Sequence, residues 1–128
     1  MPGTMEVAKR LAELFKLTAH PDRIRIIENL RLGRQDVGSL AEKLGLPVTR
    51  VSQHLGLLKA HRYVEDDREG RHHYYRLIQP DMADWILGGL EFIGAKPAHI
   101  SHEDIAAARR VWSSETTGAP TLEPISKT

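Results

Sequence analysis

Five polar residues that can bind nucleic acid stand close together in this chain of 128 residues: Thr49, Arg50, Ser52, Gln53 and His54. Arginine can form two parallel hydrogen bonds with the edge of a guanine, and glutamine can do the same with an adenine. Val51, Leu55 and Leu58 recur between them at helical spacing, so a helix over residues 48–60 would bury these three and turn the polar set outward. The pattern predicts a helix that reads the major groove of DNA. The alternative is the solvated face of an ordinary amphipathic helix.

A second basic group surrounds a glycine turn and consists of Arg68, Arg71 and His72. At the tip of a hairpin these side chains would reach phosphates or an adjacent minor groove. The alternative is an exposed turn whose arginines are neutralised by Asp66, Asp67 and Glu69. We favour a phosphate contact for Arg71. Tyr74 and Tyr75 are expected in the core of the hairpin rather than stacked on bases.

Two helices joined by a tight turn must position the polar set. Ala41 is small enough for two steeply crossing helices to touch there, and Gly45 can adopt the positive φ that ends the first of them. Residues 37–44 and 48–60 are therefore predicted to form a helix-turn-helix.

Two short strands are predicted next. Residues 63–67 and 71–77 are rich in tyrosine and valine, and Arg68–Gly70 suits the hairpin loop between them. Alternation places every second residue of the latter strand on the same face: His73, Tyr75 and Leu77 on one, His72, Tyr74 and Arg76 on the other. A hairpin directly after a helix-turn-helix is the winged-helix arrangement, so the predicted fold class is mainly α with a small β-hairpin.

Further helices are expected on both sides of this unit. Residues 5–17 and 21–33 have apolar residues at helical spacing, and another helix is predicted to begin at Pro80 and to be interrupted at Gly94. Ser101 is expected to cap a last helix that ends near Trp112.

We divide the chain into three parts on this basis. Residues 1–97 form the winged helix-turn-helix and dimerisation domain, and residues 98–112 form a C-terminal helix. Residues 113–128 are rich in Ser, Thr, Gly and Pro, a composition that predicts a disordered tail.

The helix after Pro80 has more apolar surface than one small core can absorb. Together with the N-terminal helix it would form a face that a second copy covers, giving a two-fold dimer with two recognition helices. The alternative is burial within one chain and a monomer. The residues that we assign to the dimer interface are Leu11, Leu14, Phe15, Met82, Trp85, Ile86, Leu90 and Ile93.

Four blocks in this order and spacing make the chain resemble the ArsR/SmtB family of bacterial winged-helix repressors over about residues 5–93. They are Leu17-Thr-Ala-His-Pro-Asp-Arg-Ile-Arg-Ile-Ile27, Leu40-Ala-Glu-Lys-Leu-Gly-Leu46, Val51-Ser-Gln-His-Leu-Gly-Leu-Leu58 and Arg68-Glu-Gly-Arg-His-His-Tyr-Tyr-Arg-Leu77. The resemblance implies a homodimer that binds double-stranded DNA and represses transcription by occupying promoter DNA.

Two departures from the family pattern concern phosphate contact and sensing. Pro47 and Val48 stand where many relatives have small polar residues at the start of the recognition helix. Metal-responsive relatives often have a cysteine pair in the stretch that matches Asp36–Gly38, or an Asp/His set on the last long helix, and neither is present here. The effector stays open between an unknown small molecule, a metal ion, and none at all, with control by the abundance of the protein.

No cofactor and no metal site are assigned. The chain has no cysteine, which excludes disulfides and thiolate ligands within it. His99 and His102, with Glu103 and Asp104, are the candidates for a borderline metal such as zinc or nickel. Because the expected cap at Ser101 leaves His99 in a loop, the alternative is a charged first turn that interacts with the helix dipole.

Composition excludes other classes of protein. We expect no enzyme, because no nucleophile, base and oxyanion donor are placed together and no glycine-rich phosphate loop is present. No run approaches the ~20 apolar residues of a membrane span, and no signal sequence is recognised, so a cytoplasmic location is predicted. Basic character lies with the predicted reading unit: residues 1–80 have 14 Lys and Arg against 10 Asp and Glu, and residues 81–128 have 4 against 7.

The sequence thus predicts a homodimeric transcriptional repressor that binds a pseudo-palindromic operator. The alternative from another class is a protein-interaction module, in which the winged helix is a dimerisation scaffold and the acidic C-terminal third binds a partner protein. A steep salt dependence of DNA binding would distinguish the first from the second.

Overall fold

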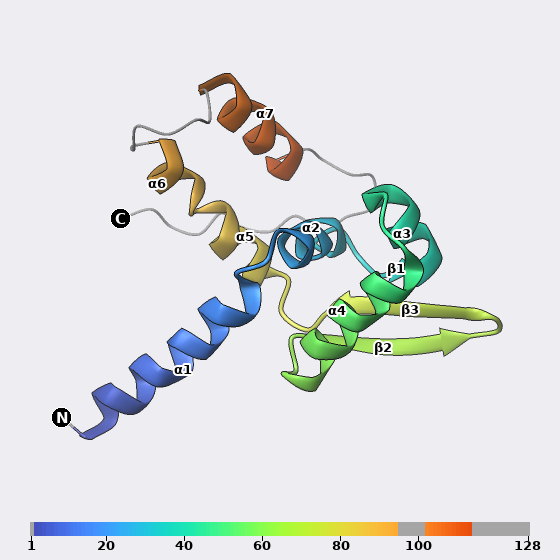
Figure 1. Ribbon diagram of the computed structural model, residues 1–128, viewed down its shortest axis with the longest axis horizontal. Coiled ribbons are helices and arrows are strands. Elements are labelled where there is room, and N and C mark those ends of the chain that lie inside the picture. Colours follow the sequence, from blue (N-terminus) through green and yellow to red (C-terminus); the bar gives the residue numbers. More distant parts are fainter. Residues whose placement is uncertain (1, 95–101, 114–128) are drawn as a thin grey trace.

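The computed structural model describes residues 2–94 and 102–113 (Figure 1). Within these ranges the chain is mainly helical, as predicted, and none of the helices is long and apolar enough to cross a membrane. The elements are, in chain order, α1 (Pro2–Thr18), α2 (Pro21–Leu30), β1 (Gln35–Asp36), α3 (Val37–Leu44), α4 (Val48–Ala60), β2 (Val64–Glu69), β3 (His72–Leu77), α5 (Asp81–Leu87), α6 (Leu90–Gly94) and α7 (His102–Ser113).

The helix-turn-helix has the predicted bounds. The carboxylate of Asp36 accepts a hydrogen bond from the Ser39 N–H (3.2 Å) and so caps the start of α3. At its end Gly45 has φ 68°, the left-handed conformation that glycine adopts without a steric penalty. Ala41 is buried where α3 packs on α4. Local sequence signals are therefore sufficient to place both helices.

The sheet has one strand more than the sequence predicts. Its antiparallel order is β1-β3-β2, with Gln35 opposite Tyr75 and Val64 opposite Leu77. A strand of two residues shows no alternation, so β1 is recognisable only from its pairing with β3.

The hairpin turn is tighter than the predicted loop Arg68–Gly70. The ladder continues until Glu69 pairs with His72, which leaves only Gly70 and Arg71 to turn the chain. Gly70 has φ 63°, as such two-residue turns require. The predicted alternation is confirmed, because Tyr75 and Leu77 are buried. The hairpin projects beyond the helices (Figure 1).

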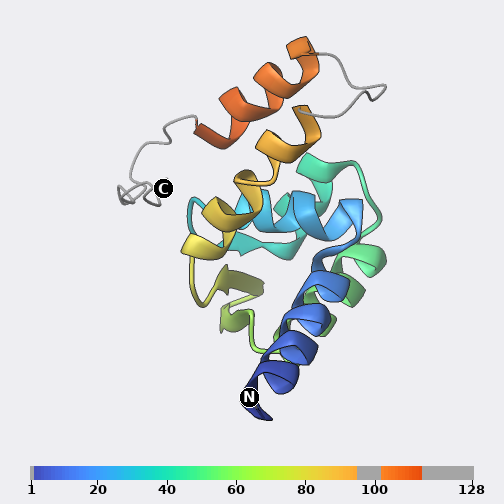
Figure 2. The same cartoon turned by 90° about the vertical axis from the view of Figure 1, so that its left-hand side faces the viewer.

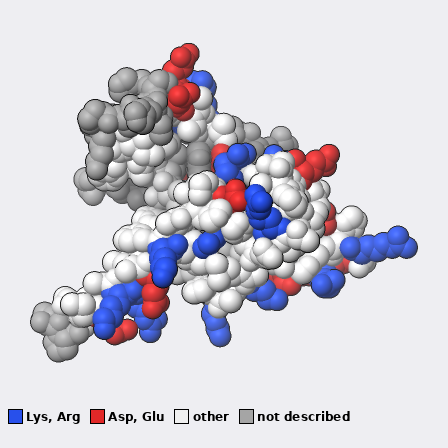
Figure 3. Space-filling view, in the orientation of Figure 1, with Lys and Arg blue, Asp and Glu red and all other residues white. Residues whose placement is uncertain are grey.

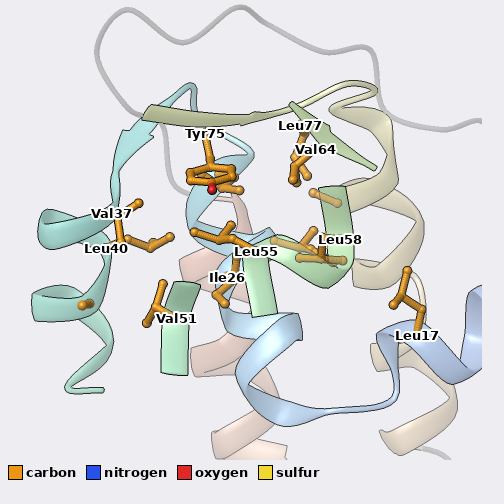
Figure 4. Packing of buried hydrophobic residues seen from close by; sticks show 14 residues of the cluster. Leu17, Ile26, Val37, Leu40, Val51, Leu55, Leu58, Val64, Tyr75 and Leu77 are labelled. Carbon is orange, nitrogen blue, oxygen red and sulfur yellow. The ribbon is translucent and has the colours of Figure 1, made fainter. Parts of the chain in front are cut away.

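The hydrophobic core lies between the sheet and the helices α2, α3 and α4 (Figure 4). Tyr75 and Leu77 point from β3 toward Leu55 and Leu58 of α4. The largest side chains with less than 2% of their surface exposed come from α2, α3, α4 and β2: Ile26, Ile27, Leu30, Leu40, Val51, Leu55, Leu58 and Val64. The recognition helix is thus held against both the sheet and its partner helices.

The predicted helix after Pro80 is broken in two. Gly88 and Gly89 separate α5 from α6, and the Gly89 N–H bonds to the Ile86 carbonyl (2.9 Å), an i→i−3 pattern tighter than an α-helix. A Cβ on Gly89 would lie 3.1 Å from the same carbonyl oxygen. Two adjacent glycines have poor helix propensity, which explains why the helix is interrupted here. The tight turn leaves little space for a side chain.

The terminal helices are close to the predicted ones. α1 extends from Pro2 to Thr18, three residues longer at its start and one at its end than the predicted range 5–17. α7 ends at Ser113, next to the predicted Trp112, and packs beside α6 (Figure 2). Residues 114–128, which make up nearly all of the predicted tail, lie outside the described residues. The division into three parts stays a prediction.

Candidate nucleic-acid interface

The predicted recognition helix α4 has one buried and one open face. Val51, Leu55 and Leu58 are fully buried. The exposed residues of the polar set are Thr49, Arg50, Ser52 and Gln53. In the part of the chain that the structure describes, none of these four side chains forms a hydrogen bond or an ion pair. Their donors and acceptors are available to an external ligand.

The start of α4 carries no side-chain cap. Pro47 is the N-cap residue, with φ −62° and ψ 144°, and contributes no side-chain hydrogen bond. The backbone N–H groups of the first turn are therefore not capped by a side chain. They lie at the positive end of the helix dipole, an arrangement that favours the binding of a phosphate. Pro47, which stands where many relatives have a small polar residue, offers no side-chain contact to a phosphate. The backbone N–H groups of the first turn remain available for one.

His54, the fifth member of the polar set, turns inward. Only 12% of its side chain is exposed, and its Nε2 lies 3.5 Å from Oδ2 of Asp22. Its ring packs edge-on against His20, with 4.6 Å between centroids. Burial lowers the pKa of His54, and the neighbouring His20 and Arg23 lower it further. The side chain thus joins α4 to the start of α2 instead of facing outward with Arg50 and Gln53.

The acidic residues of the hairpin are paired with residues other than the arginines near its tip. Arg34, just before β1, bonds Asp67 through Nη1 (3.2 Å) and Glu69 through Nη2 (3.0 Å). Its guanidinium also lies over the ring of Tyr74. The hydrogen bond from Arg34 lowers the pKa of Glu69.

Asp66, the third of these carboxylates, joins the hairpin to α4. It accepts a hydrogen bond from Nε2 of His73 (2.6 Å) and pairs with Nζ of Lys59 at the end of α4 (2.9 Å). These two contacts, with that from His73 the stronger, lower the pKa of Asp66 to about 2. The hairpin and the recognition helix are therefore braced against each other by a charged network.

The arginines near the hairpin tip have no such partners. Arg68 and Arg71 are exposed, and neither forms an ion pair among the described residues. His72 is exposed over 61% of its side chain, and its Nδ1 lies 3.3 Å from Oδ1 of Asp36. Asp66, Asp67 and Glu69, which the alternative for this turn pairs with the arginines, form their ion pairs with Lys59, His73 and Arg34 instead.

Basic side chains surround the two reading elements. In Figure 3, Lys and Arg project from the far end of the hairpin and from the lower edge of the molecule, where α4 and the hairpin lie. Acidic side chains are visible over α7, over α3 and along α1 as well, in part beside basic ones.

The eight residues that we assign to a dimer interface lie on α1, α5 and α6 and are unequally exposed. Phe15 and Trp85 are 50% and 40% exposed and stack on each other, with ring centroids 5.6 Å apart and planes at 12°. Leu11 and Ile93 are exposed as well. The half-buried remainder is Leu14, Met82, Ile86 and Leu90; of these, Met82 and Ile86 pack against the core.

A groove of about 590 Å³ opens beside the Phe15–Trp85 pair. Phe92, which the sequence analysis did not assign, lines it and is 72% exposed. This apolar surface is continuous with the stacked pair, since Phe15, Trp85 and Phe92 line the same groove.

Neither of the two histidines weighed as metal ligands has a side chain among the described ones. His99 lies outside the described residues, and only the backbone of His102 is described, at the start of α7. A different group of ligands comes together instead: one atom each of His20, Asp22 and His54, all within 4.8 Å of one another.

Several residues of this surface could not be identified from the sequence around them. Arg34 and Lys59 are single basic residues outside the predicted hairpin, and their importance depends on chain pairing. His20 and Asp22 are visible in the sequence only as the start of a helix around Pro21. Their approach to His54 requires the packing of α2 on α4.

The fold and this surface define a winged helix-turn-helix regulator that binds DNA. The family model described as "Bacterial regulatory protein, arsR family" matches residues 20–66. Over 93 residues the chain is 36% identical to the HTH-type transcriptional repressor SmtB of Mycobacterium tuberculosis, covering 73% of this chain and 69% of that protein.

Solved structures with a similar fold also belong to DNA-binding regulators. The crystal structure of M. tuberculosis Rv0081 superposes with a TM-score of 0.62 at 34% identity, covering 70% of this chain and 90% of that one. A homodimeric winged helix-turn-helix DNA-binding domain from Mycobacterium bovis, Mb0332, gives a TM-score of 0.61 at 27% identity, covering 77% and 93%. The chain belongs to the ArsR family of bacterial transcriptional regulators, which agrees with the expectation that it is not an enzyme.

Proposed function

We propose that this protein is a homodimeric repressor that acts in the cytoplasm and binds a pseudo-palindromic operator. One observation supports the proposal above all. The side chains of Arg50 and Gln53 on α4 and of Arg68 and Arg71 near the hairpin tip form no ion pair among the described residues, while Asp66, Asp67 and Glu69 of the hairpin are already paired. An unpaired carboxylate near a phosphate would oppose binding, so this pairing leaves the basic groups unopposed.

Each element has its own role in this proposal. Arg50 and Gln53 contact base edges, and Thr49 and Ser52 contact bases or phosphates. Arg68 and Arg71 hold the flanking backbone, with His72 beside them on the hairpin. His54 is left out of the DNA-contacting set because its side chain turns toward α2.

The dimer is supported by the exposed aromatic face. Phe15, Trp85 and Phe92 expose a continuous apolar surface on α1, α5 and α6. Surfaces of this kind mark interaction sites in soluble proteins. The Mycobacterium bovis relative is described as homodimeric, which supports the same assembly here. A two-fold dimer places two copies of α4 in successive major grooves.

Selection of genomic duplex fragments by the purified full chain, at near-physiological salt, tests the function. We expect enrichment of one pseudo-palindrome whose half-sites lie about one helical turn apart. Occupancy of a promoter that contains this sequence should reduce transcription in a purified system. Tight protein partners together with negligible DNA affinity would instead favour the protein-interaction module.

A further inference from the structure

Two histidines and one carboxylate converge where the recognition helix meets the start of α2. His20 is the N-cap residue of α2, Asp22 lies in its first turn, and His54 lies in the middle of α4. One ligand atom of each residue lies within 4.8 Å of the other two. All three residues are partly buried. The group therefore differs from the exposed acidic patches that are common on protein surfaces.

We propose that His20, Asp22 and His54 bind a borderline divalent metal ion such as Zn²⁺, which links α2 to the recognition helix. Two imidazoles and one carboxylate are a ligand set that zinc accepts, with water in the fourth position. The sequence analysis assigned no metal site. This one brings His54 to His20 and Asp22, which precede it in the chain by 34 and 32 positions.

The distances are compatible with an ion after small movements. With zinc–ligand distances of about 2.0–2.1 Å, two ligand atoms of a tetrahedral site lie roughly 3.3 Å apart. The Nε2–Oδ2 distance between His54 and Asp22, 3.5 Å, is already close to that value. Since all separations within the group are at most 4.8 Å, no side chain needs to move by more than about 1.5 Å.

The charges near the three residues act in opposite directions. Arg23 would repel a cation, whereas the Asp22 carboxylate would attract one. The Arg23 guanidinium is itself engaged, because its Nη1 donates a hydrogen bond to the Leu17 carbonyl (2.6 Å).

Binding of the ion would change the start of α2. Nδ1 of His20 accepts the Asp22 N–H (3.1 Å), and a neutral imidazole has only one accepting nitrogen. An ion on His20 therefore replaces this capping bond and draws the first turn of α2 toward α4. Because α4 carries Arg50 and Gln53, we expect the ion to alter operator affinity; this regulatory part rests on the proposed DNA-binding function.

Titration of the full chain with Zn²⁺, and with Co²⁺ as a spectroscopic probe, tests the site without DNA. We expect one ion per chain and the visible absorption of Co²⁺ with nitrogen and oxygen ligands. His20→Asn, which keeps a capping side chain, and His54→Gln should each weaken Zn²⁺ binding by roughly tenfold or more. Circular dichroism checks that both variants fold.

Two controls make the result specific. His61→Gln removes an exposed histidine at the end of α4 and should leave Zn²⁺ binding unchanged. A double variant, His99→Gln with His102→Gln, should also leave it unchanged. No binding by the unmodified chain, or binding that survives His20→Asn and His54→Gln but not the double variant, would overturn the proposal.

The regulatory part has its own readout. Operator affinity measured with Zn²⁺ and with a chelator should differ for the unmodified chain and not for His54→Gln. Equal affinities for the unmodified chain would overturn this part alone. Because ion binding is measured without DNA, a failure to find an operator would count against the proposed function and not against the metal site.

Discussion

The guanidinium of Arg34 lies over the aromatic ring of Tyr74, with its Cζ 3.9 Å from the ring centroid. Arg34 precedes β1, and Tyr74 stands on the neighbouring strand β3, where it pairs with Asp36. From this position the same guanidinium reaches Asp67 and Glu69 on β2. One side chain thus spans the three strands and neutralises the acidic edge of the hairpin that we propose to lie against DNA.

Arg34→Ala should weaken binding to all DNA sequences by several fold, because Asp67 and Glu69 would face the phosphates without a partner. Electrophoretic or fluorescence titrations with specific and random duplexes measure the change. Adding Glu69→Gln to Arg34→Ala should recover part of the loss. Arg76→Ala is the matched control, since Arg76 pairs with Glu65 near the other end of the hairpin. Unchanged affinity in Arg34→Ala would show that the acidic edge does not meet DNA.

Arg50→Ala and Arg71→Ala should have different effects on DNA recognition. Loss of a base contact from Arg50 should cost about 1–3 kcal/mol at the operator and relax the sequence preference. Loss of a phosphate contact from Arg71 should weaken binding evenly and reduce the slope of log affinity against log salt by about one. Competition titrations over a range of salt concentrations separate the two. Equal loss of specific and non-specific affinity in Arg50→Ala would contradict the assignment of Arg50.

Phe15→Glu should convert the proposed dimer into a monomer. An acidic group in the stacked Phe15–Trp85 face would be buried without a partner on association. We expect the dimer dissociation constant to rise by roughly 30-fold or more, equivalent to about 2 kcal/mol. Sedimentation equilibrium measures it. Lys16→Glu, the neighbouring exposed position on α1, controls for the added charge, and a dimer that persists in Phe15→Glu would place the interface elsewhere.

Asp66→Asn should destabilise the fold near neutral pH and have less effect in strong acid. The pKa of Asp66 in the folded chain is about 2, below its ordinary value of 3.8. The contribution of the carboxylate is therefore complete above about pH 4 and disappears as the pH falls through 2. We expect a loss of about 1 kcal/mol at pH 7 from the weakened contacts with His73 and Lys59.

Chemical denaturation of Asp66→Asn and the unmodified chain between pH 7 and pH 2 provides the measurement. The difference in unfolding free energy between the two should shrink over the lower part of this range. Glu42→Gln, at an exposed position of α3, should show no such trend. A difference that stays constant with pH would mean that the ionised carboxylate is not what braces the hairpin.

Two glycine substitutions in the helix-turn-helix should change stability in opposite directions. Gly45→Ala forces a Cβ into the left-handed conformation at φ 68° and should cost about 1 kcal/mol. Gly56→Ala, within α4 and with open space around the added methyl group, should stabilise by roughly 0.5–1 kcal/mol. Thermal unfolding of the two variants tests this pair, and a stabilising Gly45→Ala would contradict the assigned turn.

Much of the reading unit follows from the sequence by itself. The bounds of α3 and α4 agree with prediction because Gly45, Pro47 and the apolar spacing of Val51, Leu55 and Leu58 act over a few residues. The alternation of buried and exposed side chains along β3 is likewise set by residues that are close in the sequence. Resemblance to the ArsR family adds the function, which no single helix-turn-helix block establishes.

Only the tertiary structure decides which partners these residues have. The two-residue strand β1 exists through its pairing with β3, and Arg34, just before β1, meets Asp67 and Glu69 of β2 only because β3 pairs with both of these strands. His54 lies in a polar stretch that predicts an outward side chain, yet the packing of α2 on α4 brings His20 and Asp22 to it. Periodicity describes one element at a time, whereas a side chain at the border of two faces is directed by the neighbour that packs against it.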